Sequence, residues 1–99
     1  MIIDIHYSKM KNKRFVVTMD DDKKYNFGLR GGTTYVDTGD KNLRERYRKR
    51  HYANKTEKIL IDNLVPSASL FAYYILWGNS TDIGDNINYL NDLWAEKEK

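Results

Sequence analysis

The chain of 99 residues contains no cysteine and only two histidines. The absence of cysteine excludes a disulfide framework and thiolate metal sites, and it is typical of proteins from reducing compartments. The two histidines, His6 and His51, lie far apart in the sequence, and neither has a second metal ligand or a nucleophile at usable spacing. We therefore expect no enzymatic activity, no metal site and no cofactor.

Long hydrophobic runs are also missing. The longest apolar run, residues 70–77, has eight residues, whereas roughly 20 are needed to span a bilayer. The first eight residues are interrupted by Asp4 and His6, so they lack the apolar core of a signal peptide. We expect a soluble intracellular protein without a membrane partner.

The hydrophobic residues that are present suffice for one core. They make up 40% of the chain, and aromatic residues make up 13%, which argues against disorder. A chain of this length forms a single domain without internal staples. We therefore expect residues 1–99 to be one domain.

Residues 1–37 show the alternation of apolar and polar side chains that predicts strands. A charged turn, a polar turn at Asp20–Lys23 and the pair Gly31-Gly32 separate the segments. These connections are too short for parallel crossovers, so the strands are expected to be antiparallel. A fourth strand is predicted at Thr33–Val36, which gives a sheet of three to four strands. The apolar positions of the first three strands are Ile3, Ile5 and Tyr7, then Phe15, Val17 and Met19, then Tyr25, Phe27 and Leu29.

From Asp40 onward the period becomes helical. Asp40 is a suitable N-cap for a basic helix over residues 40–55, in which Leu43 and Tyr47 form a narrow apolar stripe. Residues 66–98 are expected to form two further helices that pack on the sheet. Pro66 opens the first and Gly78 ends it, while an apolar stripe with Leu90 marks the second. The predicted fold class is α+β.

The segment 70–77 is apolar on nearly every face, which is typical of a buried helix. It is either a core element or an oligomer interface. Because a chain of this size has difficulty covering every face of one helix, we expect a homodimer that uses this helix or the strand edges.

Most of the surplus positive charge lies in residues 40–58, where eight Lys/Arg stand against three acidic residues. The net charge is +5 there, +2 in residues 1–39 and −4 in residues 59–99. A concentrated basic element indicates a polyanionic partner. The competing interpretation is a solvated charged face, or pairing of Arg46 and Arg50 with the acids of the last helix.

Nucleic acid is the partner that this pattern favours. Clustered Lys and Arg gain affinity by releasing counterions from phosphates, and an aromatic ring among them can stack on an exposed base. The candidate contact residues are Lys41, Arg44, Arg46, Arg48, Lys49, Arg50, Tyr52 and Lys55.

Several residues also follow a pattern seen elsewhere. They are Tyr25-x-Phe27-Gly28-x-x-Gly31, Tyr35, Asp40-x-x-x-Arg44-x-Arg46-Tyr47-x-x-Arg50-His51, Pro66 and Leu76-Trp77. Over roughly residues 13–90 the chain resembles a family of small, largely uncharacterised proteins of nucleocytoplasmic large DNA viruses, such as mimiviruses and marseilleviruses. Thr38 departs from that pattern, which frequently has His there. The resemblance implies a viral origin and a place in the virion, in the viral factory of the host cytoplasm or in the host nucleus.

Together these features predict a non-catalytic, sequence-independent nucleic-acid-binding protein of a large DNA virus, with DNA favoured over RNA. The alternative is a homodimeric structural or interaction protein that recruits a viral or host protein. Charge reversal at Arg44 and Arg48 is expected to separate these functions through loss of nucleic-acid binding or loss of assembly.

Overall fold

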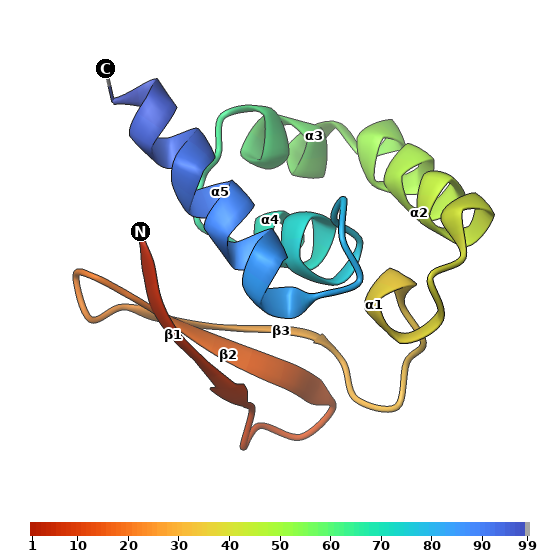
Figure 1. Ribbon diagram of the computed structural model, residues 1–99, viewed down its shortest axis with the longest axis horizontal. Coiled ribbons are helices and arrows are strands. Elements are labelled where there is room, and N and C mark those ends of the chain that lie inside the picture. The colour runs from red at the N-terminus through yellow and green to blue at the C-terminus, as the bar shows by residue number, and fades with distance from the viewer. Residues whose placement is uncertain (99) are drawn as a thin grey trace.

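A computed structural model describes residues 1–98. It contains an N-terminal antiparallel sheet followed by helices that cover one face of it (Figure 1), so the predicted α+β class is confirmed. The sheet has the order β1 (Ile2–Tyr7), β2 (Lys13–Met19) and β3 (Lys24–Leu29). The helices are α1 (Tyr35–Thr38), α2 (Lys41–Ala53), α3 (Lys55–Asp62), α4 (Ala68–Phe71), the π-helical η1 (Ala72–Leu76) and α5 (Ile83–Lys97).

The central strand β2 follows the predicted alternation. Phe15, Val17 and Met19 are buried, while the intervening Val16 and Thr18 are only partly buried. Strand β1 departs from it, because Ile3 is 61% exposed and Tyr7 is 80% exposed. The strand register shifts between Ile2 and Asp4. This bulge turns Ile2, rather than Ile3, toward the core.

The predicted fourth strand at Thr33–Val36 is wrong, because α1 begins there. The Asp37 carboxylate accepts hydrogen bonds from the Thr34 N–H (2.8 Å) and hydroxyl (2.9 Å), which closes the first turn of a helix. Arg14 of β2 donates two further bonds to Asp37, at 2.8 and 2.7 Å. Local side-chain bonding and an anchor on the sheet therefore outweigh the strand propensity of this segment.

Helix α2 begins as predicted, since the Asp40 carboxylate accepts from the N–H groups of Asn42 and Leu43. It ends at Ala53, before the predicted residue 55. Asn54 has extended backbone (φ −87°, ψ 112°), and its side chain accepts from two N–H groups of the next helix, α3. The chain bends at Asn54, and residues 59–61 belong to α3.

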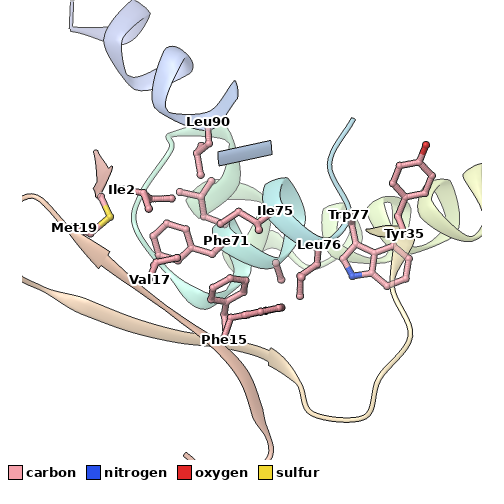
Figure 2. Close-up of a cluster of buried hydrophobic side chains, with 13 residues drawn as sticks. Ile2, Phe15, Val17, Met19, Tyr35, Phe71, Ile75, Leu76, Trp77 and Leu90 are labelled. Carbon is pink, nitrogen blue, oxygen red and sulfur yellow. The ribbon is translucent and has the colours of Figure 1, made fainter. Parts of the chain in front are cut away.

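The core lies where α4, η1 and α5 cover the sheet (Figure 2). Within residues 70–77 only Tyr73 and Tyr74 are partly exposed. One chain thus buries nearly all of this segment, so its burial requires no second copy. The helix starts one residue after Ser67, whose hydroxyl caps it, rather than at Pro66. Among residues 1–98, no helix is both long enough and apolar enough to cross a membrane.

The loop 77–80 after η1 is fixed by α5. The Asn86 amide, 2% exposed, donates to the carbonyls of Ile75 (2.9 Å) and Ser80 (2.8 Å) and accepts from the Ser80 N–H. A Cβ at Gly78 would lie 2.1 Å from the Tyr74 carbonyl oxygen, so only glycine fits there. The loop is therefore a rigid surface against which another element can dock.

Candidate nucleic-acid interface

Helix α2 docks on the core through an aromatic stack. The Tyr47 ring lies parallel to Trp77, with centroids 4.0 Å apart and planes at 8°, and His51 covers its other side at 4.1 Å. Burial raises the pKa of the Tyr47 hydroxyl. Figure 2 shows Trp77 at the end of the buried cluster next to α2. The narrow apolar stripe predicted for this helix therefore forms its contact with the core. We call this contact the seam, and it is built on the pair of Tyr47 and Trp77.

Two of the predicted phosphate-binding residues, Arg44 and Arg48, face the loop 77–80. Arg48 donates to the Trp77 carbonyl (2.9 Å) and to the Asn79 side chain (3.2 Å). Arg44 donates weakly to the Gly78 carbonyl (3.4 Å), and its guanidinium lies over the Tyr35 ring at 4.6 Å. The Arg44 side chain is only 15% exposed. Both cations thus have internal partners and stabilise the docking of α2.

Three other predicted residues, Arg46, Lys49 and Arg50, are exposed on α2; we call them the outer face. Their spacing of three and four residues places them side by side. Together with Leu43 and Ala53 they line an open hollow of about 550 Å³. Among residues 1–98 none of the three forms an ion pair with a carboxylate, including those of α5.

The remaining predicted residues lie elsewhere. Lys41 is exposed at the start of α2 and Lys55 is exposed at the start of α3. Tyr52 donates to Asp62 of α3 (2.6 Å), which raises the pKa of its hydroxyl, and its ring stacks at 5.7 Å on Tyr73. Tyr52 therefore ties α2 to α3 and η1, on a different side of α2 from the outer face.

The structure also contains a groove that the sequence did not indicate. It has a volume of about 580 Å³ and lies between α2, the segment after β3 and the α4–η1 unit. Folding brings these segments together from distant parts of the chain, so local patterns do not reveal the groove. The one local hint is Gly28, because a glycine can mark a close approach between two segments. Gly28 has φ +79°, and a Cβ there would lie 2.9 Å from the Leu76 side chain. The groove is lined by Asn12, Lys13, Gly28, Leu29, Gly32, Thr33, Thr34, Leu43, Tyr47, Arg50, His51, Glu57, Ala68, Ser69, Ala72, Leu76 and Trp77.

His51 and Glu57 form one polar corner of this groove. The His51 Nδ1 atom lies 2.9 Å from a Glu57 carboxylate oxygen, but the pair does not have hydrogen-bond geometry. Burial lowers the pKa of His51, against the opposing effect of the Glu57 charge. Among residues 1–98 no three His, Asp or Glu side chains are grouped as metal ligands.

Comparison with known proteins gives one match. Residues 3–51, just under half of the chain, match the model of a family of unknown function (DUF5754). The matched family has no known function. The segment contains the sheet from Ile3 onward, α1, and α2 as far as His51, and so includes the whole outer face. No curated protein and no solved structure matches the chain.

Proposed function

We propose that the protein binds nucleic acid without catalysing a reaction, and that the outer face of α2 makes the main phosphate contacts. The observation that carries this proposal is the position of Arg46, Lys49 and Arg50, which are exposed, adjacent and not paired with a carboxylate within residues 1–98. Such cations gain free energy by displacing counterions from phosphates, and the arginine fork grips a phosphate with two hydrogen bonds.

The proposed contact set is smaller than the one that the sequence predicted. Arg44 and Arg48 already donate to backbone carbonyls of the loop 77–80, so phosphate contact would require breaking internal bonds. Charge reversal at these two positions tests the fold rather than the function. Lys41 and Lys55, both exposed, extend the positive surface beyond the outer face.

The proposed binding is independent of sequence. Phosphate contacts carry no base information, and the outer face consists of long side chains on one helix. DNA is favoured over RNA because the motif residues resemble those of proteins from large DNA viruses. On the same ground we propose that the protein acts in a virion or at the site of viral replication.

A second candidate function is protein–protein association, including homodimerisation. Exposed apolar side chains favour it: Tyr7, Met10 and Leu29 are 80%, 53% and 66% exposed. Large exposed apolar side chains of this kind are typical of interaction surfaces. Light scattering after gel filtration tests this candidate, because a monomer over the full concentration range contradicts a homodimer.

The test of nucleic-acid binding is fluorescence anisotropy with duplex DNA across a salt series. We expect micromolar or tighter binding at low salt, with log K falling linearly against log salt. The variant R46Q/K49Q is expected to reduce the magnitude of the slope by about 1.8, since each lost phosphate contact removes about 0.9.

The matched control is K23Q/K24Q, which removes the same charge from the β2–β3 turn and the start of β3. Both lysines are exposed, and this turn lies at the end of the molecule opposite α2 (Figure 1). The control is expected to bind like the wild type. Equal losses of DNA affinity in both variants would assign the effect to net charge. Absence of binding by the wild type at low salt would contradict the proposed function.

A further inference from the structure

The groove of about 580 Å³ adjoins the outer face. Leu43 and Arg50 line both the groove and the hollow that holds Arg46 and Lys49. A nucleic-acid backbone on the outer face would therefore lie directly beside the groove. On the groove's side toward the sheet, Lys13 supplies a second cation.

The lining of the groove suits a flat, partly polar ring. Three of its buried members are apolar: Ala72, Leu76 and Trp77 are 8%, 1% and 6% exposed, whereas the buried Thr34, 6% exposed, is polar. Polar groups lie nearer the solvent, among them Thr33, which is exposed, and Lys13, which is partly exposed. Small-molecule sites have volumes of ~300–1,000 Å³ and combine apolar walls with a few polar groups in this way.

One corner of the groove is polar. The Glu57 carboxylate lines it, is 31% exposed and has one oxygen 2.9 Å from the buried His51 Nδ1 atom. Its other lone pairs can accept hydrogen bonds from a ligand edge. Nucleobase edges carry both donors and acceptors.

We infer that this groove accepts an unstacked nucleobase while the outer face holds the adjoining phosphates, so that the protein prefers single-stranded to duplex nucleic acid. The inference rests on the proposed function and specifies its ligand. A duplex keeps its bases stacked and paired, and therefore cannot place one in the groove. Phosphate contacts alone give the opposite preference, because the salt-dependent gain per phosphate is larger on B-DNA than on single strands.

The experiment measures anisotropy of a single-stranded oligonucleotide and of its duplex at one low salt concentration. The variant Ala68→Phe places a bulky ring in the groove without changing charge, since Ala68 lines the groove and is exposed. Thr33→Phe does the same from the segment that follows β3. Ala95→Phe is the matched control, because Ala95 is an exposed residue of α5 outside the groove lining.

We expect the wild type to bind the single strand more tightly than the duplex. Each groove variant is expected to lose about fivefold or more in single-strand affinity, the effect of one stacked base, while its duplex affinity and thermal unfolding stay unchanged. The control is expected to match the wild type in all three measurements.

Four results would overturn the inference. If the wild type binds duplex as tightly as single strand, or both groove variants bind single strand like the wild type, the groove takes no base while the outer face still binds phosphates. A free mononucleotide that competes as strongly as an oligonucleotide would assign the groove to a nucleotide instead. Binding of neither form at low salt would overturn the proposed function as well.

Discussion

On one side of α2, Arg44 and Arg48 donate to carbonyls of the loop 77–80, whereas on the other side Arg46, Lys49 and Arg50 extend into solvent. Both groups are positively charged, and their members are interspersed within residues 44–50. Their surroundings differ, because a rigid loop lies against one side and none of the described carboxylates pairs with the other.

The comparison shows that a run of basic residues is not one functional unit. A guanidinium that satisfies buried carbonyls contributes to folding, and its removal leaves those carbonyls without a partner. A solvated guanidinium contributes little to folding and remains available to a ligand. Substitution of Arg44 or Arg48 should therefore lower the free energy of unfolding. Substitution within the outer face should lower the affinity for nucleic acid and leave the fold stable.

The largest effect on stability is expected at the centre of the seam. Tyr47→Ala removes the ring that lies between Trp77 and His51. The loss of a large, mostly buried aromatic side chain should reduce the free energy of unfolding by about 3 kcal/mol. Urea unfolding measures it, and a loss below ~1 kcal/mol would show that α2 is held in some other way.

A smaller effect on stability is expected at Arg48, which faces the loop 77–80. Arg48→Ala leaves the Trp77 carbonyl without its donor and should cost ~1–2 kcal/mol. The neighbouring substitution Lys49→Ala, on the outer face, should stay within ~0.5 kcal/mol of the wild type. The same urea titration compares the two. Equal losses would mean that the two sides of α2 are not distinct.

The ion pair between Arg14 and Asp37 extends the comparison to an arginine that anchors a helix to the sheet. Hydrogen bonds from Arg14 lower the pKa of Asp37 from 3.8 to about 2. Because the folded state has the lower pKa, the pair stabilises the fold above about pH 4 and loses this contribution as the pH falls through 2. Solvent screening limits the gain to about 1 kcal/mol.

Unfolding of the wild type and of Asp37→Asn at neutral pH and near pH 2 measures this contribution. We expect the difference between the two proteins to be present at neutral pH and mostly gone near pH 2. A difference that is independent of pH would show that the carboxylate charge is not responsible.

The smallest expected effect belongs to His51, at the edge of the seam. Burial lowers its pKa in the folded state, against the Glu57 charge, so the neutral ring is favoured. A lowered folded pKa gives stability that is complete above about pH 6.5 and is lost as the pH falls below it. The unfolding temperature of the wild type should therefore fall more between about pH 8 and about pH 5 than that of His51→Gln. The opposite order would show that Glu57 dominates.

Much of the fold follows from local patterns in the sequence. The alternation in β2, the Asp40 cap and the buried Leu90 of α5 are each set by neighbours within a few residues. The exposure of Ile3 could not be predicted in this way, because the β1 bulge depends on pairing with β2. At Thr33–Val36 the apolar pattern favoured a strand, and the bonds between Thr34 and Asp37 produced a helix.

The candidate site was predicted only in part. A helical wheel identifies the narrow seam of α2, yet it cannot show that the loop 77–80 lies against Arg44 and Arg48. The groove was not predictable either, since its walls come from segments as distant as Lys13 and Trp77. Local periodicity therefore describes the helix, while the partners of its side chains depend on the tertiary fold.

The most direct test of the central claim is an NMR titration of the protein with a single-stranded oligonucleotide at low salt. We expect the largest backbone amide shifts on α2 between Arg46 and Ala53 and on the groove segment near Thr33. We expect almost none at Lys23 and Lys24. Shifts concentrated away from α2, or no shifts at saturating oligonucleotide, would contradict the assignment of the outer face as a nucleic-acid-binding surface.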